Sequence, residues 1–327
     1  MTINLSNLIL SPPVFLAPMS GVTDRPFREI VQLFRPGLVV SEMIASSEQN
    51  IKVFKKTIKK NFSTRRQEFA PTSIQLVGNE LKQMSMGAKI IEDEGGDIVD
   101  INMGCPAKKI VGRLAGSALM KEPNAAIKII RAVVKSTRLP VTLKMRLGWD
   151  DNCLSAKSIA IAAEDVGIQM LTIHARTRCQ FFKGKADWKS VKKIKQVVNI
   201  PIIINGDIYD TRTAKDALDA SGADGVMIGR GALGKPWVLN EVAANVFGCR
   251  DISSLVLKDI ADLIVSHLQK TVLFYGESEG VRIFRKHLCA YLKGLGYSKN
   301  IIKDIATDAD FESVCFKITK LLNSELR

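Results

Sequence analysis

The sequence predicts an α/β fold, a (β/α)8 TIM barrel followed by a small all-helical C-terminal domain. Over residues 14–240, eight short apolar, β-branched runs alternate with segments of helical periodicity, and a barrel of eight such units typically takes ~250 residues. Each run is followed by polar residues, glycine or proline. After Pro236-Trp237 the runs stop, and only amphipathic helical periodicity remains.

The predicted strands are aliphatic and bounded by turn residues. In chain order they are Val14–Ala17, Leu38–Ser41, Thr72–Leu76, Ile98–Ile101, Val141–Lys144, Met170–His174, Pro201–Asn205 and Gly225–Ile228. The predicted connecting helices are Arg25–Leu33, Lys82–Glu94, Asn124–Thr137, Ser155–Val166, Trp188–Val197 and Thr213–Ser221. An open, doubly wound sheet is the alternative arrangement, but no G-x-G-x-x-G turn follows the first strand.

The change of pattern late in the chain sets the domain boundary. We assign residues 1–248 to the barrel, with Leu239–Phe247 as its closing helix, and residues 249–327 to a second domain. The amphipathic helices predicted there are Leu255–Leu268, Val281–Leu292 and Phe311–Leu322.

Composition favours a soluble cytoplasmic enzyme. The 327 residues are 46% hydrophobic and 24% charged, which is typical of a globular protein and leaves no membrane role. The apolar stretch Leu8–Met19 is interrupted by Ser11 and two prolines and lacks a basic leader, so it predicts neither a signal peptide nor a spanning helix. The six cysteines show no C-x-x-C pair, which predicts reduced thiols and no metal site. We expect a monomer without a protein partner.

The net charge of +14 predicts a polyanionic partner. Nearly all of it lies in residues 1–240, yet residues 281–303 also hold basic residues and no acid. Any one basic cluster is more often a solvated helix face, but three together favour nucleic acid. The clusters are Lys52, Lys55, Lys56, Lys59, Lys60, Arg65 and Arg66; Lys183, Lys185, Lys189, Lys192, Lys193 and Lys195; and Arg282, Arg285, Lys286, Lys293, Lys299 and Lys303. Within the last cluster we predict nucleic-acid contacts for Arg282, Arg285 and Lys286.

Cys105 is the main candidate for chemistry. It lies in a polar loop just after the predicted strand Ile98–Ile101, together with Asn102. Ligands bind at the carboxyl ends of strands in parallel α/β folds. The alternative interpretation of a Gly-Cys-Pro turn is a tight corner with a small apolar filler.

Polar residues follow the other strands as well. Lys144 and Arg146 are two apart and share one face of a strand, as do His174 and Arg176; Arg176 and Arg178 are predicted substrate contacts. Lys144 suits either a Schiff base or the charge stabilisation of an anionic flavin. The amides of Gln75 and Asn102 suit the edge of a flavin or a pyrimidine.

The loops after the last two strands predict a phosphate site. Asn205-Gly206-Asp207 and Gly229-Arg230-Gly231 combine small residues with one cation. Backbone N–H groups can approach an anion there, as in the usual phosphate site of this barrel type. Two glycine turns that merely close a barrel are the alternative.

With these motifs assembled, the chain closely resembles the tRNA-dihydrouridine synthases, and within them the bacterial DusB branch. The matching motifs occur in order along nearly the whole chain. They are APMSGVTDRPFR near the start, SEM at 41–43, DINMGCPAKKI, AGSALM at 115–120, TLKMRLGW, LTIHARTR, NGDI and MIGRGALGKPW.

The resemblance implies an FMN-binding barrel followed by a helical tRNA-binding domain. It implies that NADPH reduces FMN, and that hydride then passes to C6 of a D-loop uridine, at position 17 for this branch. Cys105 would give a proton to C5, with Asn102 and Arg146 facing the uracil. FMN would be held, without a covalent link, by Pro18, Met19, Ser20, Gln75, Lys144, His174, Asn205, Gly206, Asp207, Gly229 and Arg230. Ser20 stands where alanine is frequent in this branch.

Two other functions remain open at this point. A flavin barrel could reduce a free pyrimidine or another small enone, in which case free uracil would oxidise the reduced enzyme. A tRNA-binding protein without catalysis would not need Cys105 or Lys144.

Overall fold

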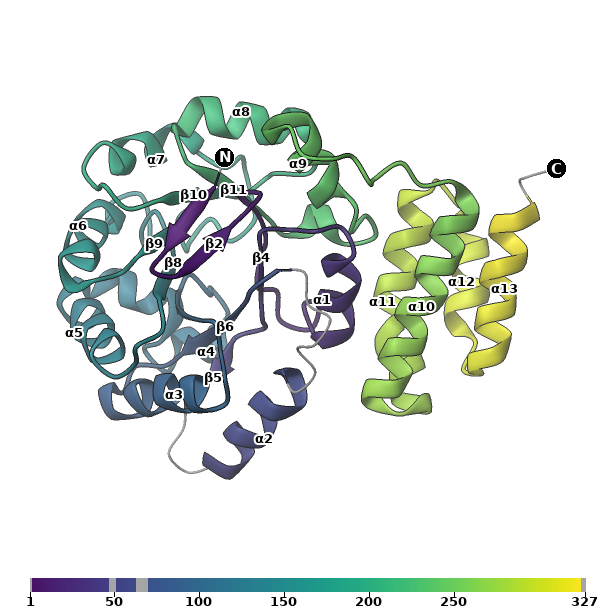
Figure 1. The fold of residues 1–327 in the computed structure, drawn as a ribbon, viewed down its shortest axis with the longest axis horizontal. Coiled ribbons are helices and arrows are strands. Elements are labelled where there is room, and N and C mark those ends of the chain that lie inside the picture. The colour runs from purple at the N-terminus through teal and green to yellow at the C-terminus, as the bar shows by residue number, and fades with distance from the viewer. Residues whose placement is uncertain (1, 47–50, 63–69, 325–327) are drawn as a thin grey trace.

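The computed structural model describes residues 2–46, 51–62 and 70–324 (Figure 1). Within these residues, eight parallel strands form a closed barrel, in which the last strand pairs with the first and the second pairs with the third. The strands are β3 (Val14–Leu16), β4 (Leu38–Val40), β6 (Thr72–Val77), β7 (Ile98–Met103), β8 (Val141–Arg146), β9 (Met170–His174), β10 (Ile202–Asn205) and β11 (Gly225–Ile228). The predicted barrel is confirmed, and the open sheet is wrong because β11 pairs with β3.

Helices surround the barrel (Figure 1). They are α1 (Arg25–Gln32), α2 (Ile51–Phe62), α3 (Leu81–Asp93), α4 (Lys108–Val111), α5 (Pro123–Val134), α6 (Ala156–Val166), α7 (Trp188–Lys195), α8 (Thr211–Ser221) and α9 (Val238–Phe247), with 3-10 turns η3 (Gly116–Lys121) and η4 (Arg230–Ala232). Sequence periodicity missed the short strands β1 (Ile3–Leu5), β2 (Leu8–Leu10) and β5 (Ile44–Ala45), because two or three residues show no period.

The strands of the barrel are buried along their whole length. Every residue of β6, β7, β8 and β9 is buried, because both faces of a barrel strand are covered, although polar residues stand at every second position of β8, at Thr142, Lys144 and Arg146. Alternate residues of a strand share one face, and the face of β8 that carries Lys144 and Arg146 contributes both of them to the cavity described below.

The C-terminal region is helical, as predicted. It contains α10 (Leu257–Tyr275), α11 (Glu277–Gly294), α12 (Lys299–Thr307) and α13 (Phe311–Ser324), which stand together at one side of the barrel (Figure 1). Their apolar faces pack around Ile264, Phe284 and Ile318, in a cluster that also includes Ile30 and Phe34 of the barrel. The assignment of residues 249–327 as a separate domain stays a prediction. Among the described residues, the helices are too short or too polar to cross a membrane.

The helical region packs on α1 of the barrel. The ring of Phe27 lies 5.6 Å from that of His267 and 5.1 Å from that of His287. At the edge of this contact, Tyr275 Oη donates to Asp24 at 3.1 Å and Lys270 Nζ to Glu29 at 2.8 Å. A buried aromatic centre with polar bonds around it thus joins the two parts.

We expect this junction to weaken on acidification. Burial lowers the pKa of His267 well below its ordinary value and that of His287 to about 3. The unfolded chain therefore takes up protons below about pH 6.5 that the folded chain does not. The free energy of unfolding should decrease as pH falls from 6.5 towards 3, by about 1.4 kcal/mol per histidine at pH 5.5.

Urea unfolding at pH 7.5 and pH 5.5 tests this with His287→Leu. Both ring nitrogens of His287 lack hydrogen-bond partners among the described residues, so an apolar replacement should be tolerated at pH 7.5. The variant should lose about 1.4 kcal/mol less than the parent between the two pH values. An equal loss in both proteins would contradict the role of His287.

Candidate active site

A cavity of about 510 Å³ opens where the barrel strands end. It is lined by residues from loops that follow successive strands, as expected for the carboxyl edge of a barrel. The predicted residues that line it are Pro18, Met19, Ser20, Gln75, Asn102, Cys105, Lys144, Arg146, His174, Asn205, Gly206, Asp207, Gly229 and Arg230. The cofactor set, the proposed acid and both residues predicted to face uracil thus share one space.

Cys105 is held at the cavity by its backbone. Asn102 Oδ1 accepts from the Cys105 N–H at 2.9 Å, and the Cys105 carbonyl accepts from the Ser117 hydroxyl at 2.8 Å. Gly116 passes close by with a φ of +59°, and a Cβ there would lie 3.0 Å from the Cys105 carbonyl oxygen. The thiol, which is free, therefore projects from a loop fixed without its help.

Lys144 is a buried cation beside Asn205. Its Nζ donates to Asn205 Oδ1 at 3.1 Å, and Asn205 Nδ2 donates to the Met227 carbonyl. Burial, reinforced by Arg146, lowers the pKa of Lys144 to about 8, while Asp100 and Cys105 oppose the shift. A lysine with this pKa is still mostly protonated at neutral pH, and its charge lies in a poorly solvated site where it acts strongly on an anion.

Arg146 is a fixed positive group that also organises the loops. Its guanidinium donates to the carbonyls of Gly104, Thr177 and Phe181 at 2.8 to 2.9 Å. Burial lowers its pKa to about 10, so it stays charged at neutral pH. It thereby ties the Cys105 loop to the loop after β9.

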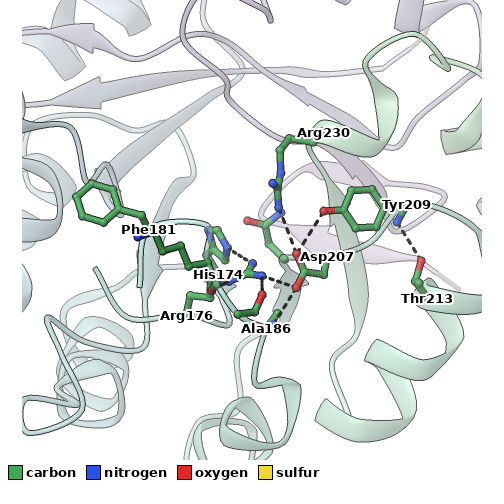
Figure 2. Close-up of polar contacts among 12 residues, drawn as sticks. His174, Arg176, Phe181, Ala186, Asp207, Tyr209, Thr213 and Arg230 are labelled. Atoms are coloured by element: carbon green, nitrogen blue, oxygen red, sulfur yellow. Dashed lines mark hydrogen bonds and ion pairs between the residues drawn. The ribbon is translucent and has the colours of Figure 1, made fainter. Parts of the chain in front are cut away.

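A cluster of charges surrounds Asp207 at the predicted phosphate loops. Arg230, Tyr209 and Arg176 all turn toward this carboxylate (Figure 2). Its Oδ2 accepts from Arg176 at 2.5 Å and its Oδ1 accepts from Arg230 at 3.2 Å. Burial raises the pKa of Asp207, but Arg176, the Ala186 N–H and Arg230 outweigh it and hold the pKa below its ordinary value. The loop is therefore built around a carboxylate that is ionised at neutral pH.

His174 packs beside these loops as a neutral ring. Burial, followed by the nearby charges of Arg146 and Lys144, lowers its pKa well below the ordinary value. Gly206 next to it has a φ of +111°, and a Cβ there would lie 2.8 Å from His174 Cδ2. Glycine at this position thus lets the ring and the loop backbone approach each other.

The predicted substrate contacts Arg176 and Arg178 are not among the residues that line the cavity. Arg176 is 1% exposed and donates to the Lys183 and Gly184 carbonyls in addition to Asp207. The Arg178 guanidinium lies over the rings of Trp149 and Phe181 at 4.5 and 4.9 Å. Both arginines here hold loops of the protein, and their contact with substrate stays a prediction.

Sequence reasoning missed several cavity residues. Met43, Phe181, Phe182 and Tyr209 also line it, and Phe182 and Tyr209 are 53% and 41% exposed. The Arg230 guanidinium lies 5.0 Å from the Phe182 ring and 5.8 Å from the Tyr209 ring. In the sequence, the two adjacent phenylalanines in a polar loop could have indicated part of this aromatic rim.

The basic clusters are distributed unequally around the barrel. Arg65 and Arg66 lie outside the described residues, while the lysines of α2 are exposed. Lys195 in α7 pairs with Asp224, which also accepts from the N–H of Ile202 at the start of β10. The end of α7 is therefore at the edge of the barrel opposite the cavity.

The basic residues predicted in α11 differ in their accessibility. Arg282 is exposed and pairs with Glu279 at 2.9 Å. Arg285 is partly buried and donates to the Asp308 carbonyl at 3.3 Å, and Lys286 is also partly buried. Arg282 is therefore the most accessible of the three.

The dihydrouridine synthase (Dus) family model matches residues 15–323. The chain belongs to this family. It is 49% identical over 291 residues to a probable tRNA-dihydrouridine synthase of Rhodobacter capsulatus, covering 89% of each chain. It is 42% identical over 289 residues to tRNA-dihydrouridine synthase B of Vibrio vulnificus, covering 88% of this chain and 89% of the relative. The resemblance found in the motifs is confirmed.

The fold of this dihydrouridine synthase family member is also similar to a solved structure of morphinone reductase in complex with tetrahydroNAD. The TM-score is 0.50 at 14% identity, over 76% of this chain and 90% of that chain. This likeness supports the barrel fold. Within the described residues, His, Cys, Asp and Glu side chains form no group of three that could hold a metal ion.

Proposed function

We propose that this protein is a cytoplasmic tRNA-dihydrouridine synthase that reduces the C5–C6 double bond of a D-loop uridine, with FMN as cofactor and NADPH as reductant. The observation that carries the proposal is that Cys105, Lys144 and Arg146 line one cavity in a chain of this family. The names of its relatives, which include tRNA-dihydrouridine synthase B, support tRNA as the substrate. Position 17 is the uridine that the motifs favour.

The cavity fits a flavin nucleotide. Its volume is within the usual range for small-molecule sites, roughly 300–1,000 Å³. Lys144 and Arg230 supply positive charge, and the turns at Gly206 and Gly229 expose backbone where this barrel type binds phosphate. The residues that would hold FMN are Pro18, Met19, Ser20, Gln75, Lys144, His174, Asn205, Gly206, Asp207, Gly229 and Arg230. FMN bound there would supply the hydride for C6 of the uracil ring.

The residues of the chain then have distinct roles. The cations of Lys144 and Arg146, with the amide of Asn102, stabilise the negative charge that develops on the uracil oxygen when C6 is reduced. Cys105 gives its thiol proton to C5, and the resulting thiolate regains a proton from solvent. The uridine leaves its stack to reach the cavity, which costs a few kcal/mol and least in an irregular loop.

Two measurements test this function. The purified protein should be yellow and release FMN on denaturation, and with NADPH it should form dihydrouridine in unmodified tRNA. In a deletion strain, mass-spectrometric mapping should show one D-loop uridine unmodified, and the gene should restore it. A colourless protein that takes up no FMN would contradict the proposal, and oxidation of the reduced enzyme by free uracil would favour a small-molecule reductase.

RNA affinity should fall steeply with salt, because basic side chains neutralise phosphates. Each neutralised phosphate contributes a slope of about 0.7 to 0.9 in log K against log salt. Replacing Arg282, Arg285 and Lys286 by glutamine should flatten this slope and leave NADPH oxidation unchanged. Filter binding of tRNA between about 50 and 200 mM salt measures it.

The matched control replaces Lys192 and Lys193 by glutamine. These lysines are exposed on α7, near the edge opposite the cavity. Their loss should leave the slope close to that of the parent. A slope that changes with the α7 pair and not with the α11 residues would move the RNA surface to α7.

A further inference from the structure

A buried carboxylate, Asp100 in β7, lies beneath the cavity. Its neighbours across the sheet are Gln75 in β6 and Thr142 in β8. Asp100 is 4% exposed and accepts from Gln75 Nε2 and from the Thr142 hydroxyl, each at 2.6 Å. A buried carboxylate is costly unless it is well paired, and barrel interiors of this type are filled mainly by branched apolar residues. Its presence therefore needs an explanation.

The hydrogen bonds above Asp100 have a single direction. Asn102 Oδ1 accepts from the N–H groups of Gly104 and Cys105 at 3.1 and 2.9 Å. Because a backbone N–H can only donate, Asn102 must turn its Nδ2 to Gln75, whose Oε1 accepts at 2.7 Å. Gln75 then has only its Nε2 left for Asp100. Every donor in this chain points from the Cys105 loop toward Asp100.

We propose that Asp100 is a positioning residue that, as the final acceptor, fixes the orientation of the Gln75 and Asn102 amides. Two consequences follow. The Cys105 loop is held through Asn102 Oδ1, which accepts two hydrogen bonds, and Gln75 Oε1 is directed to Asn102, from which it accepts one. The second N–H of Gln75 takes no part in this chain of bonds, and the second N–H of Asn102 meets only the sulfur of Met43 at 3.9 Å, so this wall of the cavity offers donors to carbonyl or anionic oxygens.

The negative charge of Asp100 also favours hydrogen-bond donors on this side of the cavity. In its ionised form Asp100 opposes the loss of the proton from Lys144, so it helps to keep that neighbour a donor. Burial raises the pKa of Asp100, while Gln75, Thr142 and Lys144 oppose the shift. Either protonation state still accepts from Gln75, since a protonated acid can donate to the Thr142 oxygen.

Two substitutions separate the orienting role from simple packing. Asp100→Leu removes the acceptor and leaves a buried Gln75 donor unpaired. Asp100→Asn keeps an oxygen for Gln75 and can donate its amide to the Thr142 oxygen. The alkylation rate of Cys105 by iodoacetamide, followed by peptide mass spectrometry, reports how firmly the loop is held, with exposed Cys179 as the internal reference.

Asp100→Leu should change the rate at which iodoacetamide alkylates Cys105 by at least about fivefold, the factor expected when a buried donor loses its partner. The Asp100→Asn rate should stay within about twofold of the parent, and Cys179 should be unaffected in both. Equal rates in the Leu variant and the parent would overturn the proposal. So would an Asn variant that behaves like the Leu variant.

A double variant, Asp100→Asn with Gln75→Glu, tests the polarity of the wall. The introduced carboxylate can accept from both neighbours, so Asn102 keeps its orientation, but the N–H donor at position 75 is gone. Cys105 alkylation should match the parent while the FMN dissociation constant rises about tenfold. An unchanged FMN dissociation constant would contradict the proposal that this wall of the cavity offers N–H donors to a ligand. The double variant remains informative if Asp100→Leu does not fold.

Ser73→Ala is the matched control. Ser73 is buried in β6, two residues before Gln75, and its hydroxyl has no hydrogen-bond partner among the described residues. It should change neither the Cys105 rate nor the FMN affinity. The FMN readout rests on the proposed function, whereas alkylation does not. If the parent binds no FMN, the proposed function fails, and the Leu-to-Asn comparison still decides the role of Asp100.

Discussion

Cys105→Ala should slow the reaction of reduced enzyme with tRNA by ~10² to 10⁴-fold, the usual range for the loss of a general acid. The structure explains why this substitution should remove the thiol without disturbing the loop. The loop is fixed through the N–H and carbonyl of residue 105, by Asn102 and Ser117, so removal of the sulfur leaves those bonds in place. The variant should fold, bind FMN, take electrons from NADPH and bind tRNA near normally.

Rapid mixing of anaerobically reduced protein with unmodified tRNA measures this step by the return of flavin absorbance. Cys179→Ala is the control, because Cys179 is an exposed thiol that does not line the cavity. Reoxidation of the Cys105→Ala variant at the parent rate would make Cys105 the small filler of a tight turn. The proton at C5 would then come from water or from another loop.

Lys144→Met should weaken FMN binding and slow the reaction with tRNA by ~10² to 10³-fold, as expected when a preorganised charge is removed from a poorly solvated site. Methionine replaces the four-carbon stem of lysine with a chain of similar length but removes the ammonium group, so Asn205 Oδ1 loses its donor. The sign of the pH dependence follows from the lowered pKa of Lys144, about 8. FMN affinity in the parent should fall as pH rises through that region, because the cation is lost.

Titration of FMN into apoprotein between pH 6.5 and 9.5 checks this dependence. In Lys144→Met the affinity should be low at every pH, without the decline near pH 8. Lys128→Met, which changes an exposed lysine on α5, should follow the parent curve. A Lys144→Met variant with the parent's pH profile would assign the decline to another group.

Local patterns were sufficient for the architecture. The predicted strand Gly225–Ile228 and the predicted helix Arg25–Leu33 agree with the structure to within a residue. The first is an apolar run and the second an amphipathic segment, both are bounded by turn or capping residues, and Asp24 does cap α1 by accepting from the Phe27 N–H. Helix α12 was missed because its nine residues follow Gly296 closely and only Ile305 among them is buried.

The sequence by itself determined the order of barrel units, the strand ends at which Cys105, Lys144 and His174 lie, and the helical nature of the C-terminal region. These features depend on period and on neighbouring turn residues, which act over a few positions. Only the tertiary structure decided which polar side chains bond one another. Asp100 is the clearest case, because its bonds to Gln75 and Thr142 arise from the register of three strands far apart in the chain. Similarly, Arg176 donates to Asp207 because the barrel brings together the loops after β9 and β10, which are separate in the sequence.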